Sequence, residues 1–294
     1  MSGSHRVRDV LTPRRRLAPV SEAELSIADL APSLDRYTIA ALADLHHTPH
    51  ADVAWLSHAI DTVNATAPDL IVLLGDYGES FRRSPILSRR WYREALDEMT
   101  PYLARLRARD GMIAVLGNHD YYAGAEMVRA WLQRLGAEVL VNRARNVERP
   151  GGALRIAGMD DLREGRTDRF AGCDVASRVP TVVLSHNPDG ILYLDPRLRV
   201  DGVLAGHTHG GQIVIPAYGA LVTMARTCGR RSASGWVRNA RAPLYVTRGL
   251  GQQLPIPIRI NCPPEIVVMR LKSGVSTQRT HSSTAVAIHR QSAR

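Results

Sequence analysis

The sequence contains few cysteines, few aromatic residues and no long apolar run. Its three cysteines, Cys173, Cys228 and Cys262, are far apart in a chain of 294 residues, so they form neither a CxxC metal motif nor a disulfide framework. This pattern is typical of a protein from a reducing compartment. Aromatic residues make up only 5% of the chain, so we expect a core of aliphatic side chains. Because no stretch approaches the roughly 20 apolar residues of a membrane span, the sequence argues against an integral membrane protein.

Acidic residues are outnumbered, and lysine is nearly absent. The formal net charge is +10, and Lys272 is the only lysine. Half of the excess charge lies between Arg270 and Arg294, a stretch with four arginines, one lysine and no acid. The charge favours anionic partners, including phosphates and acidic lipid surfaces. Because so much of it lies in one tail, it argues against a protein dedicated to binding nucleic acid.

The two ends of the chain differ from its middle. Residues 1–36 are predicted to form a loosely ordered arm, because acids and prolines interrupt their apolar residues. Residues 273–294 are rich in Ser, Thr, Gln and Arg, which predicts a disordered basic tail. We therefore expect one domain over residues 37–272. No apolar signal segment follows the arginines near the N-terminus, so the expected location is the cytoplasm.

Short apolar runs alternate with helical patterns in the middle of the chain. The runs cover residues 37–42, 70–74, 112–116, 181–184 and 202–205, and each is bounded by glycine or polar residues, which is typical of buried strands. Apolar residues at helical spacing lie between the first three runs. Later predicted strands, at 154–157, 244–247 and 266–271, have fewer helices between them, which favours antiparallel pairing there. The pattern predicts an α/β fold with a mixed sheet or a pair of sheets.

Each of the five runs ends in polar residues of the kind that bind metals. They are Asp44, His46, Asp76, Asn118, His119, His186, His207 and His209. One such histidine is more often structural, but a core does not collect this many ionisable groups unless something neutralises them. A mixture of Asp, Asn and His without Cys suits a pair of divalent first-row metal ions. Two such ions can hold both the attacking and the leaving oxygen of a phosphoryl transfer.

The order of these blocks resembles a known family. Asp44-Leu-His46, Gly75-Asp76, Gly117-Asn-His-Asp120, His186 and Gly206-His-Thr-His209 look like the five-block signature of the calcineurin-like metallophosphoesterases. The resemblance covers about residues 37–271. Three further stretches are similar to bacterial phosphodiesterases related to UDP-diacylglucosamine pyrophosphate hydrolases: Gly206–Gln212, Gly117–Tyr122 and Pro263–Ile266.

The family resemblance implies a fold and a set of ligands. The implied fold is a four-layer αββα sandwich with two mixed β-sheets and a metal site at the C-terminal ends of the strands. One divalent ion (Mn, Fe or Zn) would be held by Asp44, His46 and His209. A second would be held by Asn118, His186 and His207, with Asp76 bridging the two.

The resemblance also implies an activity. A water bridging the two ions would attack phosphorus in line, hydrolysing a phosphodiester or pyrophosphate bond of a lipid- or nucleotide-linked substrate. His119 would lie near the leaving oxygen and donate a proton, with Asp120 orienting its ring. Two alternatives stay open: a phosphomonoesterase or phosphoprotein phosphatase, which uses the same metal core, and an inactive interaction scaffold. Every ligand position is filled, which argues against the scaffold. Glu79 stands where the family often has Asp, and we expect this difference to affect only fine positioning.

The segment from Phe81 to Leu96 has a separate interpretation. It places five arginines among apolar and aromatic residues, a pattern that predicts contact with an anionic membrane surface and a peripheral position at the inner membrane face. The alternative is an ordinary amphipathic helix that covers the sheet.

Two weaker features also have two interpretations each. Arg226, Arg230, Arg231 and Arg248 either bind substrate phosphate or form a solvated basic surface. Asp160 and Asp161 either support the metal ligands or are ordinary loop acids.

Overall fold

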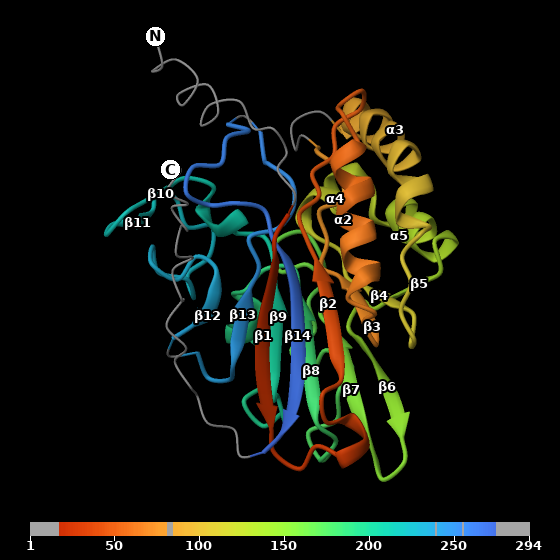
Figure 1. The fold of residues 1–294 in the computed structure, drawn as a ribbon, viewed down its shortest axis with the longest axis vertical. Helices are drawn as coiled ribbons and strands as arrows, with labels where there is room; N and C mark the ends of the chain where they lie inside the picture. Colours follow the sequence, from red (N-terminus) through yellow and green to blue (C-terminus); the bar gives the residue numbers. More distant parts are fainter. Residues whose placement is uncertain (1–17, 81–84, 239, 255, 275–294) are drawn as a thin grey trace, which may run out of the picture.

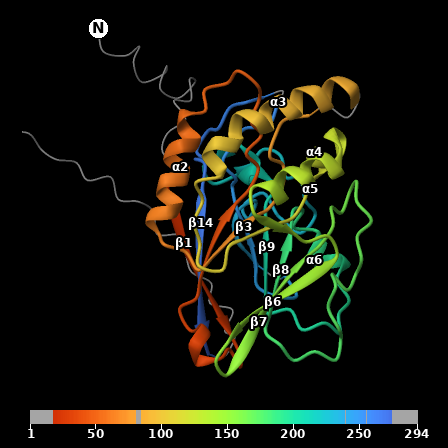
Figure 2. The ribbon, with the colours of Figure 1, turned by 90° about the vertical axis from the view of Figure 1, so that its right-hand side faces the viewer.

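Two six-stranded β-sheets lie face to face and form the centre of the fold (Figures 1 and 2). The computed structural model describes residues 18–80, 85–238, 240–254 and 256–274. The first sheet has the strand order β1 (Val20–Ile27), β14 (Ile266–Ser273), β2 (Thr38–Leu42), β3 (Leu70–Leu73), β4 (Met112–Ala114) and β5 (Ala137–Val139). The second has the order β12 (Gly235–Val237), β13 (Leu244–Val246), β9 (Gly202–Ala205), β8 (Thr181–Ser185), β7 (Gly152–Gly158) and β6 (Arg143–Arg149). The predicted α/β fold with two mixed sheets is confirmed.

Both sheets are parallel in their centres. Strands β2 to β5 run parallel to one another, as do β7, β8, β9 and β13. Antiparallel pairs join β14 to β2, β6 to β7 and β12 to β13. The antiparallel pairing expected in the second half of the chain occurs at the two edges of the second sheet, where β14 joins the first sheet, and in a two-stranded hairpin within residues 214–220. Because the central strands are parallel within each sheet, their C-terminal ends lie at one edge of that sheet, and the loops that follow them can form one site.

The helices cover the outer face of the first sheet. They are α2 (Ala54–Ala65), α3 (Pro85–Leu103), α4 (Asn118–Ala123) and α5 (Ala125–Arg134). Side chains of β2 alternate between the two faces: Ala40 and Leu42 pack against the helices, whereas Ile39 and Ala41 pack against the second sheet. The outer face of the second sheet is covered mainly by loops and by the short helix α6 (Gly190–Tyr193), so the fourth layer contains little helix.

The N-terminal region differs from the sequence prediction. Residues 20–27 do not belong to a loose arm but form β1, which pairs in parallel with β14 at the edge of the first sheet. Ala23, Leu25 and Ile27 are buried at every second position, while Glu22 and Glu24 lie on the other face. The sequence prediction treated these acids as interruptions of an apolar segment, although polar residues that alternate with apolar ones are typical of a half-buried strand. Residues 1–17 of the predicted arm and 275–294 of the predicted tail lie outside the described residues.

Candidate metal centre

The predicted ligands lie on the loops that follow five parallel strands. Asp44 and His46 follow β2, Asp76 follows β3, Asn118 follows β4, His186 follows β8, and His207 and His209 follow β9. Five of these residues have a positive φ, between 40° and 70°: Asp44, His46, Asp76, His207 and His209. Such a conformation costs a non-glycine residue about 1–3 kcal/mol and tends to occur at functional sites. The loops thus hold the backbone of these residues in a conformation that residues other than glycine seldom adopt.

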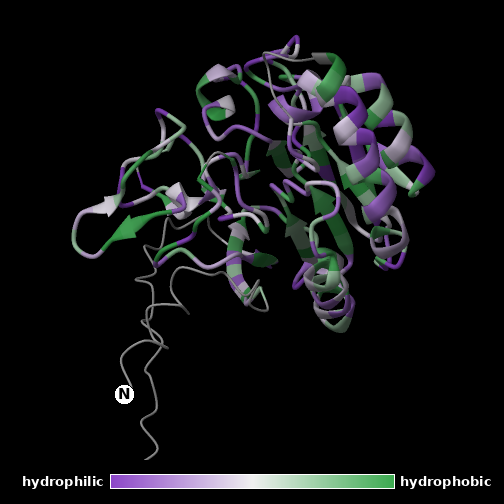
Figure 3. Ribbon diagram, turned by 90° about the horizontal axis from the view of Figure 1, so that it is seen from above, coloured by the Kyte–Doolittle hydropathy of each residue, from purple (hydrophilic) through white to green (hydrophobic). Residues whose placement is uncertain are grey.

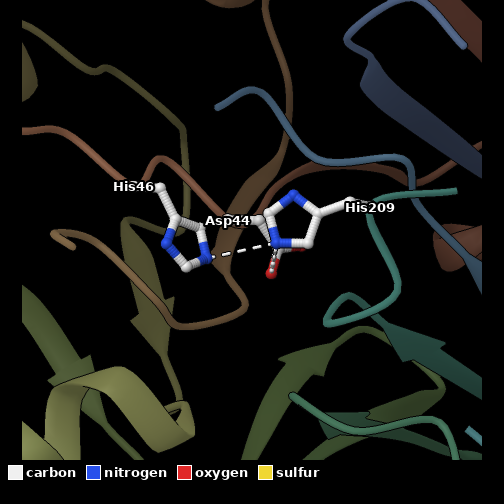
Figure 4. Close-up of side chains that lie close together, drawn as sticks. All are labelled: Asp44, His46 and His209. Atoms are coloured by element: carbon white, nitrogen blue, oxygen red, sulfur yellow. Dashed lines mark hydrogen bonds and ion pairs between the residues drawn. The ribbon is translucent and has the colours of Figure 1, made fainter. Parts of the chain in front are cut away.

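Asp44, His46 and His209 form the first group of possible ligands (Figure 4). All three are buried. The Nε2 atoms of His46 and His209 are 3.2 Å apart, and Asp44 Oδ1 lies 3.7 Å from His209 Nε2. The backbone N–H of His207 donates a hydrogen bond to the Asp44 carboxylate, which ties the loop after β9 to the loop after β2.

Asp76, His186 and His207 form the second group. His186 Nε2 lies 3.1 Å from Asp76 Oδ2 and 3.1 Å from His207 Nδ1. Asp76 Oδ2 also lies 3.5 Å from Nε2 of His46, which belongs to the first group. One carboxylate oxygen therefore faces both groups. The other oxygen, Asp76 Oδ1, accepts a hydrogen bond of 2.8 Å from the backbone N–H of His119.

The donor atoms fit divalent cations. Asn118 Oδ1 is buried and has no hydrogen-bond partner among the described residues. Atoms that bind one ion at about 2.1 Å lie about 3.0–3.4 Å apart, which matches the spacing of the ring nitrogens in both groups. Neutral imidazole together with carboxylate and amide oxygen is a donor set for first-row metals.

Hydrogen bonds at Nδ1 orient the rings of His186 and His46, so that Nε2 of each ring is the atom available to bind a metal ion. His186 Nδ1 donates to the backbone oxygen of Leu74 at 2.8 Å, and His46 Nδ1 donates to Glu79 Oε2 at 3.2 Å. Such contacts are typical of metal-binding histidines, because they set the tautomer and the ring orientation. Two glycines give the carboxylates room: a Cβ at Gly117 would lie 2.3 Å from Asp76 Oδ1, and one at Gly206 would lie 2.7 Å from Asp44 Oδ2.

The pKa values of the four histidines indicate that the buried carboxylates favour positive charge nearby. Burial lowers the pKa of His46, but its hydrogen bonds to Asp76 and Glu79 outweigh burial and raise this pKa to about 10. The pKa of His186 is likewise raised to about 10, because the charge of Asp76 outweighs the effect of burial. Burial and a neighbouring histidine hold the pKa values of His207 and His209 well below the usual range. The buried carboxylates of Asp76 and Glu79 thus favour the positively charged form of His46, and Asp76 favours that of His186.

Comparison with known proteins agrees with this geometry. Residues 37–211 match the model of the calcineurin-like phosphoesterase family. The chain belongs to the calcineurin-like phosphoesterase family. It is 31% identical over 242 residues to the uncharacterized metallophosphoesterase YkuE of Bacillus subtilis, which covers 81% of this chain and 80% of that one. It is also 31% identical over 240 residues to the phosphodiesterase YaeI of Escherichia coli, which covers 80% of this chain and 82% of that one.

A third relative is longer. The chain is 31% identical over 271 residues to a Danio rerio protein named transmembrane protein with metallophosphoesterase domain, which covers 87% of this chain and 57% of that one. Membership of the family makes the chain a metal-dependent hydrolase that acts on a phosphorylated substrate. The narrower relation to UDP-diacylglucosamine pyrophosphate hydrolases stays a prediction.

The surroundings of His119 differ from those that the family resemblance implied. His119 Nδ1 lies 3.0 Å from Glu79 Oε1, and Nε2 lies 3.3 Å from the side-chain nitrogen of Gln253. Among the described residues, Asp120 makes no hydrogen bond to this ring. Glu79, not Asp120, is therefore the carboxylate that orients His119, and it holds His46 at the same time. Although burial raises the pKa of Glu79, its hydrogen bonds to His119 and His46 lower it to about 2.

Asp120 instead supports the loops that carry the predicted ligands. Its carboxylate accepts hydrogen bonds from the backbone N–H groups of Gly117, Asp76 and Tyr77, and from the hydroxyl of Tyr92 on α3. Burial and the charge of Asp76 raise the pKa of Asp120 to about 6. The side chain thus joins the loops after β3 and β4 to helix α3.

Several residues near the site have roles that sequence reasoning missed or weighed too lightly. Gln253 follows Gly251, where a Cβ would lie 2.0 Å from the backbone oxygen of Leu45, so this glycine lets the 249–254 loop pack against the ligand loop. Asp160 and Asp161 are buried, and Asp161 Oδ2 has no hydrogen-bond partner among the described residues, so they are not ordinary exposed loop acids. Arg248 pairs with Glu265 at 3.3 Å, which argues against a free phosphate ligand. For Asp160 and Asp161, the signal available in the sequence was their position directly after a predicted strand, in Gly158-Met-Asp-Asp161.

Proposed function

We propose that this chain hydrolyses phosphodiester or pyrophosphate bonds with two divalent metal ions, of Mn, Fe or Zn. The observation that carries the proposal is the position of Asp76 Oδ2, which lies within 3.5 Å of ring nitrogens from both ligand groups. Asp44, His46 and His209 would hold one ion, and Asn118, His186 and His207 the other, with Asp76 shared. Two such ions supply Lewis acidity and make water a better nucleophile for in-line attack on phosphorus.

His119 is the proposed proton donor to the leaving oxygen. Its ring is nearly buried beside the two ligand groups, 4.6 Å from the ring of His46 between centroids. Nδ1 lies 3.0 Å from Glu79 Oε1 and 3.3 Å from the backbone nitrogen of Ser80, so these two residues hold that edge of the ring. A positioned acid of this kind contributes about 10²- to 10⁴-fold to the rate.

A diester or pyrophosphate substrate is favoured over a monoester by similarity. YaeI is named a phosphodiesterase, and the chain matches it over most of both lengths. The filled set of ligands argues against an inactive scaffold.

We also propose that the enzyme works in the cytoplasm, on a lipid- or nucleotide-linked substrate at the inner membrane face. Helix α3 buries Tyr92 and Leu96 but exposes Ile86, Leu87 and Trp91 by 86%, 68% and 38%. The predicted segment is thus a helix that covers the sheet with one face and leaves an apolar face outside.

The exposed face of α3 is also basic. Arg89, Arg90 and Arg93 are exposed beside the apolar residues, and such a mixture suits an anionic lipid interface. Phe81, Arg82 and Arg83 of the same segment lie outside the described residues. In the described part of the chain, no helix is both long and apolar enough to span a bilayer.

Replacing the shared carboxylate tests the site. The purified protein and its Asp76→Asn variant are supplied with Mn²⁺ and assayed on a soluble phosphodiester, a pyrophosphate diester and a phosphomonoester. We expect hydrolysis of the first two by the unmodified protein and none by Asp76→Asn, with Asp97→Asn on the exposed face of α3 as a control. Near-normal turnover by Asp76→Asn with two bound ions would refute the site, and preference for the monoester would favour the phosphatase alternative.

A further inference from the structure

A small hairpin projects from the molecule close to the metal centre. Strands β10 (Val214–Ile215) and β11 (Gly219–Ala220) pair in antiparallel fashion, and the hairpin begins just after the short helix η2 (His209–Gly211), which carries the ligand His209. In Figures 1 and 3 it stands on the opposite side of the molecule from α3. The predicted metal centre adjoins both, because His209 lies on η2 next to the hairpin and Tyr92 of α3 donates a hydrogen bond to Asp120 beside the predicted ligand Asn118.

The hairpin and the residues after it expose several large apolar side chains. Ile215 is 44% exposed, Tyr218 51%, Leu221 40% and Val222 57%. Pro216 and Ala217 at the tip are exposed as well. Single apolar residues are common on protein surfaces, but six exposed apolar residues within positions 215–222 favour an interaction site.

Arginines brace the hairpin from its base. Arg230 donates hydrogen bonds to the backbone oxygens of Ala220 and Leu221, and its guanidinium lies 5.0 Å from the centre of the Tyr218 ring. Arg231 donates to the backbone oxygen of Ala217 at 2.8 Å. These contacts keep the tip extended, and they place two exposed cations next to its apolar side chains.

The sequence around the hairpin contains no acid. Between Asp201 and Glu265 there is no Asp or Glu, whereas seven arginines occur. The first half of helix α3 shares this composition as far as Arg93, because no acid lies between Glu79 and Glu94, whereas Glu94, Asp97 and Glu98 follow in its second half. Two basic, acid-free segments with exposed aliphatic side chains therefore flank one site. Arginines alone would suit any polyanion, but exposed Ile, Leu and Val gain nothing from a nucleic acid and gain from the acyl region of a bilayer.

We infer that the β10–β11 hairpin is a second membrane anchor, which inserts its apolar tip into an anionic bilayer while Arg230 and Arg231 meet lipid phosphates. With α3 on the other side, it turns the opening of the metal centre toward the bilayer. This inference rests on the membrane contact proposed above for α3. Tyr92 joins α3 to Asp120, and His209 lies five residues before the first strand of the hairpin, so both anchors are connected to the loops of the site.

The experiment measures sedimentation with vesicles of phosphatidylcholine, with or without phosphatidylglycerol, at low and high salt. The double variant Tyr218→Ser/Val222→Ser is compared with Tyr218→Phe/Val222→Ile, which keeps the apolar surface, and with Leu192→Ser, an exposed position on α6. We expect the serine variant to bind anionic vesicles about tenfold more weakly, because two apolar side chains no longer leave water. Both comparison variants should bind like the unmodified protein, and circular dichroism checks that each variant is folded.

A second measurement reports insertion directly. In a Trp91→Phe background, Val222→Trp is mixed with vesicles whose acyl chains carry bromine, and we expect its fluorescence to be quenched. Binding that is lost with salt but unaffected by the serine pair, without quenching, would overturn insertion and leave only surface attraction. Binding to RNA is measured for the same two double variants. If the serine pair and the Phe/Ile pair both bind RNA as tightly as anionic vesicles, insertion of the hairpin is also overturned. Hydrolysis of a soluble diester by the unmodified protein is measured separately, so vesicle binding without hydrolysis refutes the proposed function and not the anchor.

Discussion

Replacing Glu79 by glutamine is expected to slow hydrolysis by about 10- to 150-fold. The Glu79 carboxylate is buried and accepts from His46 Nδ1 at 3.2 Å and from His119 Nδ1 at 3.0 Å. Glutamine has the same shape but only one acceptor oxygen, so at least one ring loses its partner. A hydrogen bond to a charged group is worth about 1.5–3 kcal/mol, and about 1.4 kcal/mol corresponds to a tenfold change in rate.

The assay separates the two rings that Glu79 holds. Metal content and kcat/KM for a phosphodiester are measured while Mn²⁺ is raised from equimolar to a large excess. The part of the loss that excess metal restores belongs to His46, since support of a ligand from behind typically changes metal affinity by about 10- to 100-fold. The part that remains belongs to His119. Glu79→Asp keeps the charge but is shorter, so we expect an intermediate loss. A Glu79→Gln variant with normal kcat/KM at equimolar metal would refute the reasoning.

Three further changes probe the ligands and their support. His119→Ala should keep its metal and lose about 10²- to 10⁴-fold in rate, whereas His209→Ala should lose metal; elemental analysis with the reverse result would exchange their roles. Tyr92→Phe should lower the free energy of unfolding by about 1–3 kcal/mol, read from urea denaturation, because the buried Asp120 loses a donor; an unchanged midpoint would contradict this. Burial opposes ionisation of Asp110, but its hydrogen bond to Arg149 prevails and lowers its pKa, so its stabilising effect is present above about pH 4 and is lost as pH falls further. Asp110→Asn should therefore be less stable than the unmodified protein at pH 7 and equal to it in strong acid, and a constant difference in urea midpoint would be inconsistent with this.

The strand ends could be found from the sequence because the signal is local. Each apolar run that ends in Asp, Asn or His predicts a buried strand and the loop after it, and parallel strands bring such loops to one edge. The strand β1 could not be found in this way. Its alternation of Ala23, Leu25 and Ile27 with polar residues is a strand signal, but the segment does not end in a metal-binding residue, and its partner β14 lies more than 200 residues away in the chain.

The contacts behind the ligands were equally beyond local reasoning. The family resemblance implied that Asp120, which directly follows His119, orients that ring. In the structure Asp120 faces the loop after β3, while Glu79, from a different strand end, reaches both His46 and His119. Which carboxylate meets which imidazole depends on the path of two loops in space.

By itself, the sequence determined the α/β class, the order of the motif blocks and the family. These follow from hydrophobic period and residue type, which are properties of short segments. Only the tertiary structure decided that one oxygen of Asp76 faces both ligand groups, that the ligand loops adopt positive φ, and that α3 and the β10–β11 hairpin flank the site. Those features depend on contacts between distant segments, which exist only after the two sheets have packed face to face and brought the loops at their ends together.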